Sequence, residues 1–175
     1  MSGCTLHFVR HGRGPAVVLL HGFTGSGQSM AEIAQSLEQD YETLTLDLPG
    51  HGRSADLVRT DTDGFDECVD DLVATLEFAG HRQAHWLGYS MGARLALGCA
   101  VRHPARVASL ALLGGGAGIA DPIERAARRR EDAALAAFHE AFELKLVEAV
   151  PDRRAAQREH LRERRYNQMS PDGYF

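Results

Sequence analysis

Cysteine is scarce in this sequence, and none of it is spaced as in a metal site. The only three are Cys4, Cys68 and Cys99, and no Cys-x-x-Cys pair is present. This pattern excludes a disulfide-rich scaffold and predicts no metal site. Cys68 and Cys99 lie in apolar stretches of helical pattern, which is typical of buried thiols. Free thiols fit a reducing compartment, so we expect a cytoplasmic protein.

Long apolar runs and targeting signals are missing as well. No stretch is apolar for long enough to cross a membrane, and we find no signal peptide or lipidation motif. We therefore expect no membrane partner.

The patterns that bind nucleotides or nucleic acids are also absent. The chain has neither Gly-x-Gly-x-x-Gly nor Gly-x-x-x-x-Gly-Lys-Ser/Thr, which argues against a phosphate-binding loop. Its net charge is −5, and no basic stretch is interleaved with aromatic residues. We therefore expect no nucleic-acid partner.

The composition that remains is that of an ordinary globular protein with an uneven charge distribution. The 175 residues are 44% hydrophobic and 25% charged, which allows one core and a small lid. Residues 121–175 hold 11 basic and 11 acidic side chains, and ten of the basic ones are arginines. These arginines either form a solvated face with internal ion pairs or include one or two that clamp a carboxylate.

Strand-like and helix-like patterns alternate along the first two thirds of the chain. Strand patterns cover 5–9, 16–20, 41–46, the segment leading into Gly88, and 107–113. Helical spacing covers 29–39, 65–80 and 94–102, and a polar, irregular stretch covers 58–63. The apolar runs 16–20 and 107–113 are typical of strands buried on both faces. The alternation predicts an α/β fold, with helices on both faces of a mostly parallel sheet and functional loops at the carboxyl ends of its strands.

The pattern changes after Gly118. Asp121 can cap a helix that has Pro122 in its first position. From there only helical patterns follow, over roughly 123–139, 140–149 and 152–166. We therefore divide the chain into a core, residues 1–118, and a helical lid or cap, residues 119–175.

The sequence Gly88-Tyr89-Ser90-Met91-Gly92 stands between a strand pattern and a helix pattern. Gly-x-Ser-x-Gly in this context is the form of a nucleophile elbow, a tight turn that presents a serine hydroxyl above the sheet. The two glycines are expected because strand and helix pass close to the turn. The motif alone is weakly specific, and its position between strand and helix is what makes it informative.

Three landmarks, each at a strand end, give residues 16–118 a resemblance to the α/β-hydrolase fold. They are His21-Gly22-Phe23, the segment Asp47-Leu48-Pro49-Gly50-His51-Gly52-Arg53-Ser54, and the elbow. Within that fold the chain resembles the menaquinone-pathway lyases, the 2-succinyl-6-hydroxy-2,4-cyclohexadiene-1-carboxylate synthases. This resemblance rests on residues 21–26, 63–66, 88–94 and 124–132, and it weakens after about residue 135. Arg94 and the arginine-rich start of the lid discriminate better than the elbow.

The resemblance implies an activity and a set of site residues. Lyases of this family eliminate pyruvate from an enolpyruvyl-cyclohexene carboxylate without a metal or organic cofactor, so it implies a small anionic substrate. It implies that Ser90 is catalytic and acts mainly as a base, once a histidine and a carboxylate activate it. It implies an oxyanion hole made by the backbone N–H groups of Phe23 and Met91. The side chains that it implies for substrate binding are Arg94, Arg128, Arg165 and Tyr89.

Each of these side chains also has a structural interpretation. The three arginines can be solvated surface residues, and Tyr89 can pack beneath a pocket without touching substrate. For His21 and His51 we favour the structural interpretation, in which each holds its own loop. We expect Trp86 to lie in the core or at a sheet edge rather than to bind a ligand.

One departure from the family bears on activity. In this fold the triad acid and histidine follow the serine, each after a further strand, and no strand pattern follows Gly118. The sequence thus predicts a fold truncated after the lid, active only if a longer chain supplies both groups. An ester or thioester hydrolase of the same fold is the alternative activity. A non-catalytic binding module is the second alternative, and the exposed sheet edge that truncation leaves offers a route to self-association.

Overall fold

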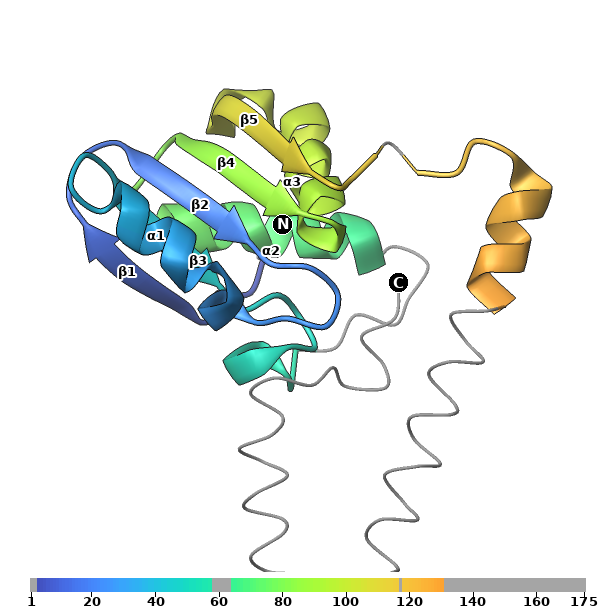
Figure 1. Ribbon diagram of the computed structural model, residues 1–175. Helices are drawn as coiled ribbons and strands as arrows, with labels where there is room; N and C mark the ends of the chain where they lie inside the picture. The colour runs from blue at the N-terminus through green and yellow to red at the C-terminus, as the bar shows by residue number, and fades with distance from the viewer. Residues whose placement is uncertain (1–2, 58–63, 117, 131–175) are drawn as a thin grey trace, which may run out of the picture.

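A single five-stranded sheet organises the part of the chain that the computed structural model describes, residues 3–57, 64–116 and 118–130 (Figure 1). The strand order is β1-β3-β2-β4-β5. β1 runs antiparallel to β3, and the other three pairs are parallel, which confirms the mostly parallel sheet. The strands are β1 (Phe8–Gly12), β2 (Ala16–Leu20), β3 (Glu42–Leu46), β4 (Ala84–Tyr89) and β5 (Val107–Leu113).

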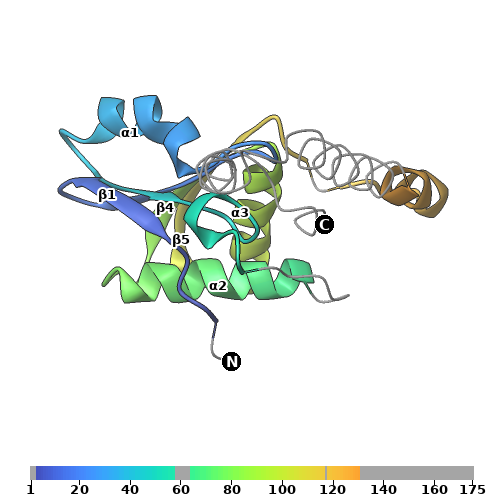
Figure 2. The same ribbon diagram turned by 90° about the horizontal axis from the view of Figure 1, so that it is seen from below.

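Helices cover both faces of the sheet, as the alternating pattern predicts. α1 lies on one face, while α2 and α3 lie on the other (Figure 2). The helices are α1 (Ala31–Leu37), α2 (Gly64–Phe78) and α3 (Met91–Arg102). Three short 3-10 helices complete the described connections: η1 (Gly27–Met30), η2 (Gly52–Ser54) and η3 (Pro104–Arg106).

β2 is the central strand, and it is buried on both faces as its apolar run predicts. Val18 and Leu20 pack in the larger cluster with α2 and α3, and Val17 and Leu19 pack in the smaller cluster with α1. Trp86 is 1% exposed in the larger cluster, which confirms it as a core residue. Its Nε1–H donates to the carbonyl of Arg106 at 3.0 Å, so its polar atom is paired.

The first strand lies further along the chain than the sequence predicts. Alternation predicts a strand over 5–9, whereas β1 spans Phe8–Gly12. The N–H groups of two preceding residues bond to side chains instead: Leu6 N–H donates to Thr75 Oγ1 and His7 N–H donates to Ser54 Oγ, both at 2.9 Å. Alternation reports which side chains are buried, and Leu6 is buried, but it does not report which backbone groups pair with another strand.

The burial predicted for β5 is wrong. Its continuous apolar run predicts a strand buried on both faces, yet every residue of Val107–Leu113 is half-buried or exposed. The physical reason is position, because among the described strands β5 lies at the sheet edge with β4 as its one neighbour. The apolar side chains of β5 are typical of a strand that packs against other elements, and the described residues do not bury them.

A helix covers residues 122–130, beyond β5. Asp121 caps it as predicted, because its Oδ1 accepts the N–H groups of Ile123 at 2.7 Å and Glu124 at 2.9 Å. Figures 1 and 2 show this helix standing apart from the sheet and its helices. The predicted irregular stretch 58–63, the remainder of the first lid helix and the helical patterns 140–149 and 152–166 lie outside the described residues.

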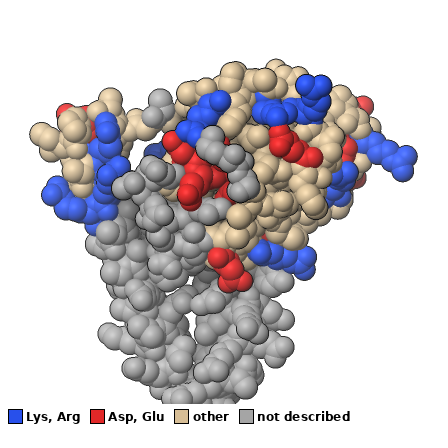
Figure 3. Space-filling model, turned by 180° about the vertical axis from the view of Figure 1, so that it is seen from behind, with Lys and Arg blue, Asp and Glu red and all other residues tan. Residues whose placement is uncertain are grey.

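Charged side chains of both signs are interspersed on the face that Figure 3 shows. Ion pairs also join elements of the described chain: Arg102 on α3 lies 2.7 Å from Asp66 on α2, and Arg106 pairs with Glu77. Exposed pairs of this kind contribute little to stability individually.

Candidate active site

Ser90 occupies the turn between β4 and α3. Its φ of 53° makes it the one non-glycine residue with a positive φ in the described part of the chain. A serine in this sparsely populated region costs free energy, and such strain is concentrated at functional sites. The turn forms because β4 ends at Tyr89 and α3 begins at Met91, which leaves Ser90 alone to reverse the chain. This is the geometry of a nucleophile elbow.

Two glycines permit this turn, as predicted. A Cβ on Gly88 would lie 2.3 Å from the carbonyl oxygen of Gly92, and a Cβ on Gly92 would lie 2.5 Å from that of Leu20. Both obstacles are backbone atoms of the sheet or the turn, so they cannot move aside as a flexible side chain would. Only glycine fits at either position.

Backbone hydrogen bonds fix the elbow to the ends of the neighbouring strands. The Ser90 N–H donates to the carbonyl of Leu113 at 2.8 Å, at the end of β5. The Gly92 N–H donates to the carbonyl of His21 at 3.1 Å, just after β2. Ser90 therefore sits at the carboxyl edge of the sheet, where parallel α/β folds place their functional groups.

The loop after β2 lies against the elbow. A Cβ on Gly22 would lie 2.9 Å from the Tyr89 ring and 3.4 Å from Ser90 Cβ, so Gly22 lies beside the serine. Phe23 is the next residue of this loop. On the other side, Met91 is the first residue of α3, and its N–H makes no hydrogen bond to any described residue. The structure thus brings Ser90, Tyr89 and Met91 together with Gly22, the residue before Phe23. The oxyanion role of Phe23 and Met91 stays a prediction.

His21 is a structural residue, as favoured from the sequence. It is fully buried, its Nδ1 donates to the carbonyl of Gly22 at 2.7 Å, and its Nε2 accepts the N–H of Leu48 at 3.1 Å. Burial lowers the pKa of His21 from 6.5 to about 4, because the charged imidazolium loses its hydration. His21 is therefore a neutral imidazole at neutral pH, with its proton on Nδ1.

His51 is also fully buried and holds two loops together. Its Nε2 lies 2.7 Å from the carbonyl oxygen of Phe23, and its Nδ1 lies 2.8 Å from that of Pro49. The His51 ring meets the His21 ring edge-on, with 5.1 Å between centroids. The two sequence landmarks that contain these histidines are therefore interlocked in space.

Asp47 strengthens this connection between the loops after β2 and β3. Its Oδ1 accepts the N–H of Gly27 at 2.7 Å, and its Oδ2 accepts the N–H of Arg53 at 3.0 Å and lies 2.9 Å from His7 Nδ1. A Cβ on Gly52 would lie 2.4 Å from the Asp47 carboxyl carbon, so the loop wraps closely around this side chain. The role of Asp47 was not among the sequence predictions, although its segment was one of the three landmarks. The signal was available, since an aspartate directly after a buried strand is suited to accept loop N–H groups.

The predicted substrate-binding side chains are placed differently from one another. Tyr89 is 54% exposed beside Ser90. Arg94 is exposed one helical turn after Ser90, and its N–H donates to the carbonyl of Ser90 at 3.4 Å. Arg128 is exposed on the helix 122–130, which the structure does not bring beside α3. Arg165 lies outside the described residues. Substrate binding by all four stays a prediction.

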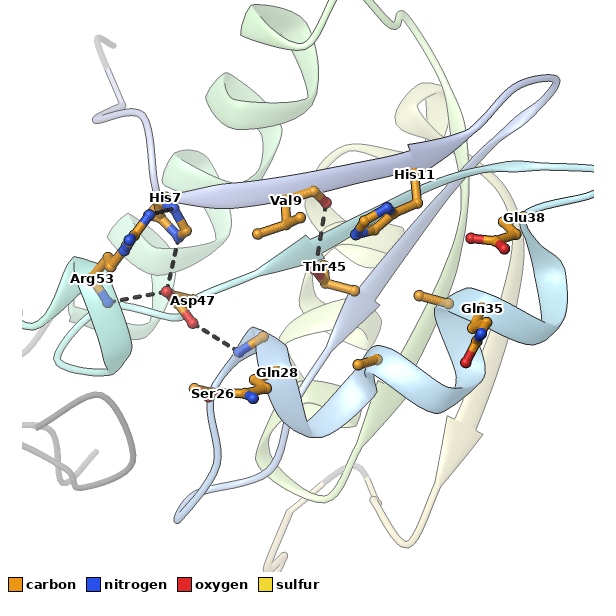
Figure 4. A pocket seen from close by; sticks show the side chains of 13 residues that line it. His7, Val9, His11, Ser26, Gln28, Gln35, Glu38, Thr45, Asp47 and Arg53 are labelled. Carbon is orange, nitrogen blue, oxygen red and sulfur yellow. Dashed lines mark hydrogen bonds and ion pairs between the residues drawn. The ribbon is translucent and has the colours of Figure 1, made fainter. Parts of the chain in front are cut away.

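A separate pocket of about 550 Å³ lies between β1 and α1 (Figure 4). His7, His11 and Glu38 line it, together with Arg53 and Asp47. Ser90, Phe23 and Met91 do not line it. The Asp47 carboxylate in this lining is already bonded to the groups named above. The lining comes from segments far apart in the chain, so sequence patterns do not predict this pocket.

No group of three or more histidine, cysteine and acidic side chains among the described residues is arranged to hold a metal ion. Within that same part of the chain, no helix has both the length and the apolarity needed to cross a membrane.

The elbow and its adjoining loops are features of a known class of protein, and comparison with known families identifies that class. The model of the alpha/beta hydrolase fold family matches residues 15–164, and the chain belongs to this family. Within the family, it is similar to two proteins named 2-succinyl-6-hydroxy-2,4-cyclohexadiene-1-carboxylate synthase. It is 41% identical to the one from Enterobacter sp. (strain 638) over 120 residues, which cover 68% of this chain and 45% of the relative. It is 42% identical to the one from Yersinia pestis (strain Pestoides F) over 122 residues, which cover 68% of this chain and 43% of the relative.

Solved structures agree on the fold. The structure of MenH from S. aureus superposes with a TM-score of 0.72 at 23% identity, covering 96% of this chain and 68% of that one. An epoxide hydrolase from an endophytic Streptomyces gives a TM-score of 0.57 at 29% identity, covering 61% of this chain and 33% of that one. The chain spans less than half the length of the two curated relatives described above.

Proposed function

We propose that this chain is part of a carbon–oxygen lyase that eliminates pyruvate from an enolpyruvyl-cyclohexene carboxylate in menaquinone biosynthesis. The observation that carries the proposal is the strained elbow at Ser90 with Arg94 one helical turn beyond it. Similarity to proteins named as synthases of this pathway supports it. The predicted cytoplasmic location, small anionic substrate and absence of a cofactor belong to the same proposal.

In the proposed reaction Ser90 acts as a base. An activated serine oxygen takes a proton from the substrate ring, the electron pair forms a ring double bond, and the carbon–oxygen bond to the enolpyruvyl group breaks. The leaving enolate of pyruvate is then protonated. Negative charge develops on the substrate during these steps. We propose that the backbone N–H groups of Met91, the first residue of α3, and of Phe23 stabilise it.

Activation of Ser90 needs a histidine and a carboxylate, because a serine hydroxyl is a weak acid on its own. Its hydroxyl bonds to no histidine in the part of the chain that the structure describes, and both His21 and His51 are committed to backbone carbonyls. We propose that the activating pair comes from additional chain. The greater length of the relatives supports this.

Arginine side chains provide the proposed specificity. A guanidinium binds a carboxylate through two parallel hydrogen bonds, so Arg94 can hold a substrate carboxylate beside Ser90. Its position on the exposed side of α3, next to the elbow, supports this role. Arg128 and Arg165 would contribute from the lid, and Tyr89 would border the same space.

The alternative activity is hydrolysis of a carboxylic ester or thioester. The same elbow and backbone donors serve acyl transfer equally well, and what distinguishes the lyase is the arginine that binds a carboxylate. The second alternative, a non-catalytic binding module, would use the exposed edge strand β5, and the same edge would allow self-association.

The two activities are separated by Arg94→Ala in the protein expressed from its complete coding sequence. Loss of a charged hydrogen-bonding partner costs roughly 1.5–3 kcal/mol, so kcat/KM for pyruvate release should fall about 10- to 150-fold. Hydrolysis of an uncharged aryl ester should change by less than about twofold, because that substrate has no carboxylate. Pyruvate is measured with a coupled dehydrogenase.

Arg102→Ala is the matched control, because Arg102 lies on the same helix and pairs with Asp66, away from the elbow. It should leave both rates unchanged. Pyruvate release by Arg94→Ala at the wild-type rate would contradict the assigned role. Efficient ester hydrolysis by a wild-type protein that releases no pyruvate would favour the hydrolase.

A further inference from the structure

Two consecutive carbonyl groups in the loop after β2 each face a buried imidazole. His21 Nδ1 donates to the carbonyl of Gly22, and His51 Nε2 lies at hydrogen-bond distance from the carbonyl of Phe23, both at 2.7 Å. Both rings are fully buried. The Gly22 carbonyl also accepts the N–H of Gly25 at 3.0 Å. These bonds fix the peptide on each side of Phe23.

We propose that His21 and His51 are positioning residues for the oxyanion hole, which together set the direction of the Phe23 N–H. This inference rests on the proposed function, in that it takes the Phe23 N–H as a donor to the reacting substrate. The histidines touch neither substrate nor Ser90. They act through the backbone of the loop.

The mechanism follows from peptide geometry. In a trans peptide the C=O and the N–H point in opposite directions. The Phe23 N–H belongs to the same peptide as the Gly22 carbonyl, so directing that carbonyl at His21 directs the N–H away from the buried rings. With the His51 proton on Nε2, the bond to the next carbonyl prevents the following peptide from rotating. A preorganised donor stabilises developing charge without reorganising during the reaction, and a hydrogen bond on the carbonyl also polarises the N–H.

His21 and His51 also connect the loop to neighbouring elements. His21 Nε2 accepts the Leu48 N–H, and the His21 carbonyl accepts the Gly92 N–H from the start of α3. His51 comes from the loop after β3 and contacts the His21 ring edge-on. The loop that carries Phe23 is therefore tied to the segment beyond β3 and to the helix that presents Met91. Both predicted donors are fixed in one framework.

Amide substitutions test the two histidines with opposite expectations. The side-chain nitrogen of Asn can replace Nδ1 of histidine, whereas that of Gln can replace Nε2. At position 21 the bond to the loop uses Nδ1, so His21→Asn should keep kcat within about threefold of wild type. His21→Gln should lower kcat roughly 10- to 100-fold, which is a smaller loss than removal of an oxyanion-hole donor causes. At position 51 the bond uses Nε2, so His51→Gln should keep kcat and His51→Asn should lower it. KM should change little in all four variants.

The measurement is kcat and KM in the protein expressed from its complete coding sequence, with the enolpyruvyl substrate and with an aryl ester, alongside the melting temperature of each variant. The crossed pattern, Asn tolerated at 21 and Gln at 51, supports the proposal. Equal activity of Asn and Gln at each position overturns it. A loss of kcat that follows the loss of melting temperature, whichever amide is present, also overturns it, since that is the behaviour of a merely structural residue.

A spectroscopic test does not depend on activity. Nitrogen NMR of the imidazoles should show the His21 proton on Nδ1 and a His51 proton on Nε2, and His21→Gln should shift the Phe23 amide resonance. A His21 proton on Nε2, or a Phe23 amide unaffected by His21→Gln, overturns the inference. If the wild-type protein turns over neither substrate, the proposed function fails, and these spectra still decide whether the two rings fix the loop.

Discussion

At the residue scale, a buried neutral histidine makes folding depend on pH. The pKa of His21 is about 4 in the folded protein against 6.5 for an unperturbed histidine, so between these values the unfolded chain binds more protons than the folded one. Stability therefore rises with pH across this window. The contribution of His21 to stability is fully present above pH 6.5 and is lost as the pH falls toward 4.

From the size of this pKa shift, we predict that the free energy of unfolding falls by about 3 kcal/mol between pH 6.5 and pH 4 because of His21. Urea unfolding of the wild-type protein and of His21→Asn at several pH values measures it. The asparagine variant does not titrate at this position, so its stability should fall less steeply on acidification. Parallel pH profiles for the two proteins would show that His21 does not carry the effect.

The cysteines give a second prediction at this scale. None of the three forms a disulfide, and Cys4 is exposed whereas Cys68 and Cys99 are buried. Burial raises the pKa of the Cys99 thiol to about 12. A thiolate is the reactive form, so Cys99 should not react with a disulfide reagent at pH 8. We expect Cys4 alone to react in the native protein and all three to react after unfolding. Native Cys4→Ser should then be unreactive, and rapid labelling of Cys99 in that variant would contradict the burial.

At the scale of elements, the turn between β4 and α3 depends on its glycines. Gly92→Ala would place a Cβ 2.5 Å from the Leu20 carbonyl oxygen, so strand or helix must shift, and the free energy of unfolding should fall by roughly 2 kcal/mol or more. Gly116→Ala is the control, since a Cβ there meets nothing within 4 Å, and it should change stability by less than about 0.5 kcal/mol. Denaturant melts compare the two. Equal stability of both variants would refute the tight elbow.

The elements show what sequence patterns can and cannot predict. Order and type of the strands and helices through β5 were predictable because hydrophobic period and glycine turns are local signals. The start of β1 was not, because residues before it bond to side chains such as Thr75 rather than to a strand. The exposure of β5 was also not predictable, because burial depends on neighbouring elements that the sequence of the strand does not specify.

The candidate site divides in the same way. The elbow could be predicted from a motif because Gly88, Ser90 and Gly92 lie within five residues. The interlocking of His21 with the loop after β3 could not, because the two segments are separated along the chain and meet only after the sheet has formed. Loop-holding roles for both histidines could be favoured from the sequence, but the partners that define those roles come from the structure.

At the scale of the whole molecule, the edge strand β5 is the feature with consequences for assembly. An edge strand with exposed apolar side chains can pair with another chain, so we predict that the 175-residue chain alone elutes from size exclusion in a concentration-dependent, associated form. Ala111→Lys on β5 should reduce this association, because a charge on an edge strand opposes pairing. Ala105→Lys, on exposed η3, is the control. A concentration-independent monomer would contradict the prediction.

The central claim is that Ser90 is the base of a pyruvate-eliminating lyase. Its most direct test is pyruvate release from the enolpyruvyl-cyclohexene substrate by the protein expressed from its complete coding sequence, compared with Ser90→Ala. The account predicts steady turnover by the wild-type protein and a loss of about 10⁴-fold or more in the variant, as for other residues of activated-serine centres. A wild-type protein that releases no pyruvate, or a Ser90→Ala variant within about tenfold of wild-type turnover, would contradict it.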